Sequence, residues 1–338
     1  MGAADARPPD ARDLVRSLVD RYAFGEIAAA ARLFGHLDPE RRDRVVHLCE
    51  FGGRLLDLDA EDFDHFPGVP AALADRACRS WMPQRPDAYE RGALASLLPA
   101  FTLMLEVIAV RWERGDMSHT LSVTHIVNEY LPLLIWEPML GHAADPARLR
   151  AHVLGESSLW ATDTRQCQHG GPERKAARIA VDVADRPMAE WQSYLDRHHS
   201  HVADALAACA GYCQADCTVR TRLPEQLRAT LRTRVRVARR LGGSPLVGLR
   251  HAAPVGHGFG VPNRTEVLEA WEETRARIDD EALPPEERAL ARHVRADDGY
   301  PLPGLPTFLS AVTNQPVHPD TLLADTRQLI AAAVDPTD

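Results

Sequence analysis

The sequence predicts an all-α protein, a multi-helix bundle with irregular Gly/Pro-rich loops. Apolar residues recur at helical spacing through most of the 338 residues, strand-like alternation is nearly absent, and Pro or Gly marks the ends of segments. The composition is that of a globular chain, with 45% hydrophobic and 26% charged residues. A chain of this length can bury a sizeable core.

Start signals define the first half of the chain. Asp10, after two prolines, begins a helix to about residue 23, and a short helix follows to about residue 37. The run Asp38-Pro39-Glu40 combines a cap, a first-turn proline and an acid, and predicts a helix through Leu56. Two apolar helices come next, over about 86–115 and 117–140.

The second half has weaker boundaries. A short helix is expected over 145–153, an irregular stretch over 155–171, and a short strand over 233–237 is an alternative to helix. The remaining predicted helices cover 172–184, 187–213, 223–240, 264–278, 284–296 and 319–334. As domains, we expect a main helical domain over 1–241, a Gly/Pro-rich loop over 242–262, and a C-terminal helical region over 263–338 packed on the same core.

Charge and lysine content exclude several function classes. The net charge of −9 argues against a nucleic-acid partner, because phosphate neutralisation needs a basic face. Lys175 is the single lysine and has no phosphate-loop glycines beside it. Pyridoxal-phosphate enzymes, P-loop proteins and protein kinases each need a lysine in their site, so all three are disfavoured.

The most hydrophobic segment, 93–112, is interrupted by Pro99, Glu106 and Arg111. A buried core helix is therefore expected, with no membrane partner. The first residues lack the basic start and apolar run of a secretory signal, so we expect a cytoplasmic protein with reduced cysteines. A homodimer is compatible with these features.

The first candidate site consists of ionisable residues on the two apolar helices. Glu106 lies in a segment that is apolar nearly all round, and a buried carboxylate there should have a cation, a metal or a proton. His125 and Glu129 stand at i and i+4, hence on one helix face. Salt bridges to the many arginines are the alternative role for these residues.

A second candidate is the histidine cluster of the helix over 187–213. His198 and His201 share one face, while Asp196 and His199 share another. Imidazole is a common ligand of iron, copper and zinc, and a nearby carboxylate orients it. The alternative is a solvated polar face.

Together these residues suggest an iron site in a helical bundle. In a di-iron version, Glu106, His125, Glu129, Asp196 and His199 supply the ligands. The frequent Glu-x-x-His signature is missing, which counts against this version. A non-covalent haem held by one of the cluster histidines needs only one ligand and is equally compatible.

Cysteines offer a different metal. Cys209, Cys213 and Cys217 recur every four residues, and Cys167 with His169 could complete a structural zinc site with Cys213 and Cys217. Packing of the cysteines as small apolar side chains is the simpler interpretation.

Arginine and a glycine-rich loop complete the candidates. Eight arginines lie between residues 220 and 240, and Arg232 and Arg236 are the candidates to hold a substrate carboxylate. The alternative is a solvated helix face whose arginines pair with the chain's excess acidic residues. His257, in the Gly-His-Gly part of the 242–262 loop, is a candidate general base on a lid.

The leading functional hypothesis is an iron-dependent oxygenase or hydroxylase, haem or di-iron, acting on a small aromatic or amino-acid-like molecule. One rival is a non-catalytic helical scaffold with structural zinc at Cys/His residues. Another is a metal-free enzyme that uses His257 as its base.

Overall fold

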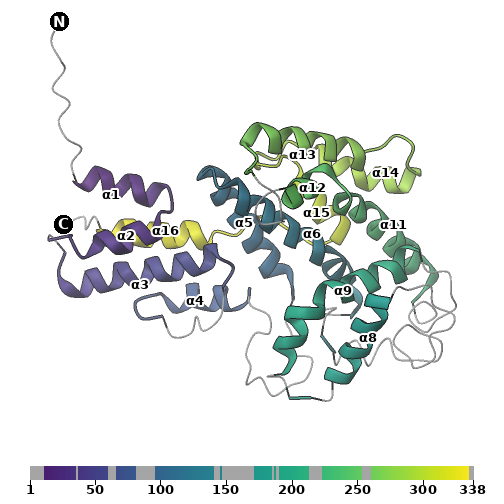
Figure 1. Ribbon diagram of the computed structural model, residues 1–338, viewed down its shortest axis with the longest axis horizontal. Helices are drawn as coiled ribbons and strands as arrows, with labels where there is room; N and C mark the ends of the chain where they lie inside the picture. The colour runs from purple at the N-terminus through teal and green to yellow at the C-terminus, as the bar shows by residue number, and fades with distance from the viewer. Residues whose placement is uncertain are drawn as a thin grey trace, which may run out of the picture.

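The protein is all-α in a computed structural model (Figure 1). In the described residues every regular element is helical and no strand occurs, which confirms the predicted fold class and removes the alternative of a strand over 233–237. The structure describes residues 11–35, 37–59, 66–80, 96–140, 145–146, 171–184, 186–187, 190–212, 223–252 and 260–334.

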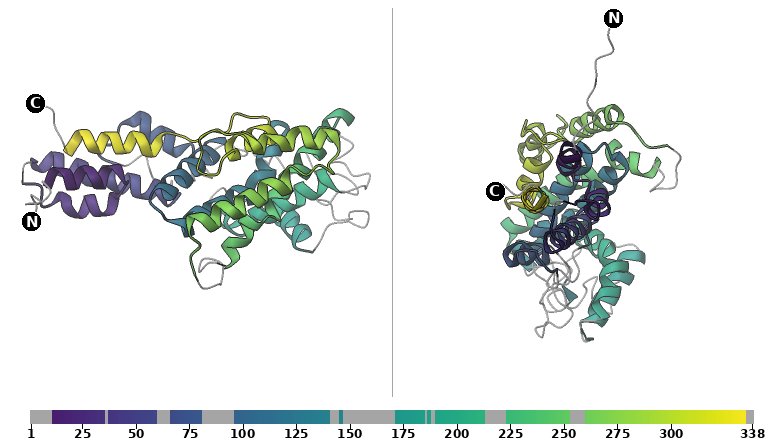
Figure 2. Two further views of the ribbon diagram at one scale, coloured as in Figure 1. Left: turned by 90° about the horizontal axis from the view of Figure 1, so that it is seen from above. Right: turned by 90° about the vertical axis from the view of Figure 1, so that its left-hand side faces the viewer.

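One group of helices brings the two ends of the chain together. It contains α1 (Ala11–Asp20), α2 (Phe24–Ala31), α3 (Pro39–Leu56), α4 (Ala71–Cys78) and α16 (Leu322–Val334). The last of these, α16, packs along α3 and also contacts α1 and α4 (Figures 1 and 2). The predicted start of α3 is confirmed, because Asp38 Oδ1 accepts a hydrogen bond of 2.9 Å from Arg41 N and Pro39 follows the cap.

The second group is built around two apolar helices, α5 (Leu98–Glu113) and α6 (Met117–Leu140). Against α6 pack α5, α9 (Trp191–Gly211) and α11 (Glu225–Gly242), while α8 (Gly171–Val183) lies beside α9. The indole of Trp136 on α6 donates a 3.1 Å hydrogen bond to the Leu206 carbonyl on α9. Helix α6 is therefore central to this group (Figure 1).

Shorter helices of the C-terminal third complete this group. They are α12 (Pro245–Ala252), α13 (Arg264–Ile278), α14 (Pro285–Ala291), a 3-10 helix (Arg292–Arg295) and α15 (Leu305–Thr313). The buried apolar residues of both groups form one continuous cluster. None of the described helices is long and apolar enough to span a bilayer.

The predicted 242–262 loop needs a correction. Its first part forms α12, which begins directly after Ser244 and buries Leu246 and Val247. The two glycines before it stop α11, and Pro245 is tolerated at the first position of a helix because that position needs no N–H donor. Over residues 242–252, glycine and proline therefore mark the boundary between two helices.

Candidate functional site

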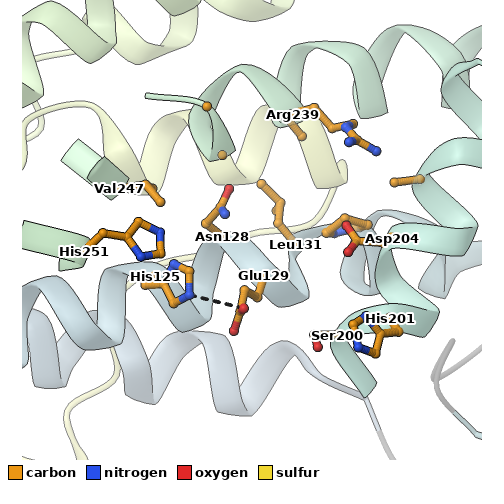
Figure 3. A pocket seen from close by; sticks show the side chains of 15 residues that line it. His125, Asn128, Glu129, Leu131, Ser200, His201, Asp204, Arg239, Val247 and His251 are labelled. Atoms are coloured by element: carbon orange, nitrogen blue, oxygen red, sulfur yellow. Dashed lines mark ion pairs between the residues drawn. The ribbon is translucent and has the colours of Figure 1, made fainter. Parts of the chain in front are cut away.

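A cavity of about 470 Å³ lies between α6, α9, α11 and α12 (Figure 3). Its volume falls in the range of small-molecule sites. The lining is rich in ionisable and polar side chains, contributed by all four helices: His125, Asn128, Glu129, His201, Asp204, Arg239 and His251.

The polar wall from α6 follows from helical spacing. His125, Asn128, Glu129 and Pro132 stand at i, i+3, i+4 and i+7, so they form one stripe along the helix. The rest of α6 is largely apolar and buried against its neighbours. A polar stripe on an otherwise apolar helix is thus placed where the surrounding helices leave space.

His125 and Glu129 are in contact within this stripe. His125 Nε2 lies 3.2 Å from Glu129 Oε1, and the two side chains are 13% and 38% exposed (Figure 3). His125 Nδ1 is buried and has no hydrogen-bond partner among the described residues. The His251 ring of α12 meets the His125 ring edge to face, with centroids 5.8 Å apart.

This arrangement favours one tautomer of His125. A proton on the buried Nδ1 would be a donor without an acceptor, which costs more than an unused lone pair at that atom. A proton on Nε2 instead lies toward the Glu129 carboxylate. We therefore place the proton on Nε2 and not on Nδ1, so that His125 donates toward Glu129 and orients it, and the carboxylate is the more exposed member of the pair.

The opposite wall comes from the histidine cluster of α9, which divides between two cavities. His201 and Asp204 line the cavity with His125. His198 instead lines a second cavity between α8 and α9, where its ring lies 6.5 Å from that of Tyr194. Burial lowers the pKa of His198, and the positive charge of Lys175 adds to that effect.

The two other members of the predicted cluster, Asp196 and His199, also belong to α9, and the structure describes their backbone only. The cluster therefore contributes one described histidine, His201, to the α6 cavity.

The arginine that reaches the cavity is Arg239. Its guanidinium stacks on Tyr212 at 5.3 Å. The predicted Arg236 is engaged elsewhere, donating to the Gly211 carbonyl at 3.1 Å and lying 3.5 Å from Glu287. Arg232 is half-buried on α11 and is not part of the cavity wall.

Glu106 has a different role from the one expected with iron. Its carboxylate is 5% exposed and accepts hydrogen bonds from Leu323 N at 3.1 Å and Ala324 N at 3.0 Å, in the first turn of α16. Burial raises the pKa of Glu106 to about 7, opposed by these two amides. The partner of this buried carboxylate is a helix N-terminus, and the structure does not bring Glu106 into the cavity with His125.

Among the described residues, no group of three or more His, Cys, Asp or Glu side chains is placed to hold a metal ion. Cys209 is buried in α9 without a disulfide. All four predicted zinc ligands and the predicted loop base lie outside the described residues: Cys167, His169, Cys213, Cys217 and His257.

Asn128, Arg239 and His251 line the cavity but had no role in the sequence-based hypothesis. Asn128 could have been found from its position one turn after His125 on the same face. Arg239 could not be distinguished in the sequence from its seven neighbouring arginines. Which of them lines the cavity depends on how α11 is oriented against α6, and the sequence does not show that orientation.

No protein-family model matches the chain, and no curated protein or solved structure shows detectable similarity to it.

Proposed function

We propose that the protein is an enzyme that removes a proton from a small polar molecule bound in the cavity between α6, α9, α11 and α12. The observation that carries this proposal is the His125–Glu129 pair, two groups able to exchange protons and held in contact at 3.2 Å in the wall of that cavity. A base oriented by a second group is the common arrangement for general acid–base chemistry.

The chemistry assigns one role to each member of the pair. The Glu129 carboxylate accepts the proton, and the substrate keeps the electron pair of the broken bond. His125 positions that carboxylate and donates toward it from Nε2.

The test is substrate consumption by the full chain. A defined mixture of small carboxylate-, amine- and hydroxyl-bearing metabolites is incubated with the protein and followed by liquid chromatography and mass spectrometry. We expect at least one compound to be converted, and Glu129→Gln to slow that conversion by about 10²–10⁴-fold, the usual contribution of a positioned base. His125→Gln should change the pH profile as well as the rate.

A matched control is available on α13. Glu273 and Arg277 form an i,i+4 ion pair of 2.6 Å with both side chains more than half exposed. Glu273→Gln therefore removes a carboxylate from an ion pair of the same spacing that does not line the proposed site. This variant should leave conversion unchanged. No conversion by the unaltered protein, or equal losses in Glu129→Gln and Glu273→Gln, would contradict the proposal.

The iron-dependent oxygenase is a second candidate, favoured by one specific observation. Three imidazoles and two carboxylates, from α6, α9 and α12, surround the same cavity: His125, His201, His251, Glu129 and Asp204. In the described residues no three of these side chains are close enough to hold one metal ion, so metal binding would require the side chains or helices to move closer together.

Metal analysis and an absorption spectrum decide between the two candidates. Iron that is retained on purification and lost in His125→Gln and His201→Gln would support the oxygenase, and a Soret band would identify haem. Zinc that survives both substitutions would support the structural-zinc scaffold. Conversion of a substrate by protein free of bound metal would favour the acid–base enzyme.

A further inference from the structure

Two prolines interrupt α6, and they leave two backbone carbonyls without their helical donors. Proline has no N–H, so Pro132 and Pro138 each remove the hydrogen bond to the carbonyl four residues earlier. Those carbonyls belong to Asn128 and Leu134. The Leu134 carbonyl has a replacement donor, the Gln315 side chain, whose Nε2 lies 3.2 Å away.

The Asn128 carbonyl lacks such a replacement. No side chain in the described part of the chain donates a hydrogen bond to it, whereas both Asn128 and Pro132 line the cavity. The missing helical bond opens on the face of the proline, which here is the cavity face. Asn128 thus lies in the cavity wall with a carbonyl that lacks its i+4 helical donor, and such a carbonyl can accept a hydrogen bond from a ligand.

The Asn128 side chain is held close to α11 at the same place. A Cβ added at Gly242 would lie 3.2 Å from Asn128 Oδ1, so only glycine allows this approach without displacement. Arg239 stands one turn before Gly242 on α11 and also lines the cavity. The Asn128 carbonyl and Arg239 therefore lie on two adjacent helices whose separation is fixed by a close glycine contact.

Arg239 supplies the complementary charge. It is exposed, its guanidinium stacks on Tyr212, and it forms no ion pair with a carboxylate in the described part of the chain. An arginine fork binds carboxylates in bidentate fashion. Glu129 and Asp204 stand on the α6 and α9 walls of the same cavity, so positive and negative groups face the cavity from different helices (Figure 3).

We propose that the cavity binds a small zwitterion of the amino-acid class, with its ammonium group donating to the Asn128 carbonyl and its carboxylate held by Arg239. This inference rests on the proposed function in that it fills the same cavity, and it names the class of substrate presented to Glu129. It requires only binding, so it can be tested without turnover.

Isothermal titration calorimetry of the full chain with each of the twenty common L-amino acids provides the test. At least one should bind, and the corresponding α-hydroxy acid, which lacks the ammonium group, should bind about ten- to a hundredfold more weakly, the effect of losing a charge-assisted hydrogen bond. Arg239→Gln should weaken binding by a similar factor, and Arg277→Gln, an arginine of the α13 surface pair, should not.

The two prolines give a matched pair of variants. Pro132→Ala restores an N–H that occupies the Asn128 carbonyl, so it should weaken amino-acid binding about tenfold or more. Pro138→Ala makes the same chemical change at Leu134, whose carbonyl Gln315 already occupies, and should leave the affinity unchanged. Circular dichroism of both variants checks that the fold is retained.

The outcomes separate this inference from the proposed function. If an amino acid binds but is not converted, the proposed ligand class is supported and the proposed enzymatic function is contradicted. If a molecule without an amino group is converted, the enzymatic function is supported and the ligand class is contradicted. The inference is overturned if none of the twenty amino acids binds, or if the α-hydroxy acid binds as tightly as the amino acid.

Discussion

Glu106 on α5 and Glu129 on α6 look alike in the sequence, because both are carboxylates on strongly apolar helices. Their surroundings in the structure are different. Glu106 is 5% exposed and accepts two backbone N–H groups of α16. Glu129 is 38% exposed and lies against His125 in a cavity wall. One carboxylate closes a helix end, and the other lies beside a histidine in the wall of a cavity.

Two carboxylates of the apolar helices obtain their hydrogen-bond partners from distant parts of the chain. The amides that satisfy Glu106 lie more than two hundred residues away, at the start of the last helix. Glu137 on α6 behaves in the same way, accepting from Leu97 N at 2.8 Å and from the Ser96 hydroxyl at the start of α5. Carboxylates that are fully occupied by helix N-termini stabilise the fold, and carboxylates left partly exposed beside a histidine are the candidates for chemistry.

The largest expected effect is on stability. Glu106→Ala leaves two buried N–H groups of α16 without acceptors and removes packed volume, so the free energy of unfolding should fall by about 3 kcal/mol. Glu129→Ala changes a half-exposed side chain and should stay within about 0.5 kcal/mol. Urea denaturation of both variants measures the difference, and equal losses would mean that the two carboxylates share one structural role.

The pH dependence of stability sharpens the same contrast. Burial raises the pKa of Glu106 to about 7 from its ordinary 4.5, so between these values the folded state holds a proton that the unfolded chain has released. The contribution of Glu106 therefore grows as the pH falls from 7 toward 4.5 and is constant above that window.

Relative to Glu106→Gln, the unaltered protein should gain on the order of 2 kcal/mol between pH 8 and pH 5. Urea denaturation at a series of pH values measures this gain. A relative loss of stability on acidification would show that the amides of α16 outweigh burial and hold the carboxylate charged.

The two prolines of α6 extend the comparison from side chains to the backbone. Pro132→Ala supplies a donor to a carbonyl that has lost its helical partner, and should raise the free energy of unfolding by about 1 kcal/mol. Pro138→Ala should raise it less, because Gln315 already donates to the Leu134 carbonyl. A larger gain at position 138 in thermal and urea unfolding would contradict this description of α6.

The smallest effect is expected at the edge-to-face contact of His251 with His125. His251→Ala removes one ring of that pair from the exposed end of α12, and should cost about 0.5 kcal/mol. Urea denaturation measures this contact when His251→Ala is made both in the unaltered protein and in the His125→Ala variant. If His251→Ala lowers the free energy of unfolding by the same amount in both, the contact between the two rings does not stabilise the fold.

Much of the fold was predictable because local signals coincide with it. The cap at Asp38 and the apolar run over 117–140 define α3 and α6 with the observed ends. The short helices α12 and α15 were not predicted, since their Gly and Pro residues read as loop signals while their stability comes from burial of Leu246, Leu305 and Phe308. Packing across the chain, which the local pattern does not contain, decides such helices.

The candidate site was predictable in part for the same reason. The i,i+4 spacing of His125 and Glu129 is local, and the structure places both with His201 in one cavity. The sequence could not show that Glu106 meets α16, that His198 belongs to another cavity, or that Arg239 is the arginine at the site. Each of these depends on how two distant helices face each other.

The most direct measurement compares Glu106→Gln and Glu129→Gln in one experiment, with urea denaturation and substrate consumption recorded on the same preparations. We expect Glu106→Gln to lose stability but still convert the substrate under native conditions, and Glu129→Gln to keep its stability and lose conversion. A Glu129→Gln variant that is unstable but active when folded, or a Glu106→Gln variant that is stable and inactive, would contradict this expectation.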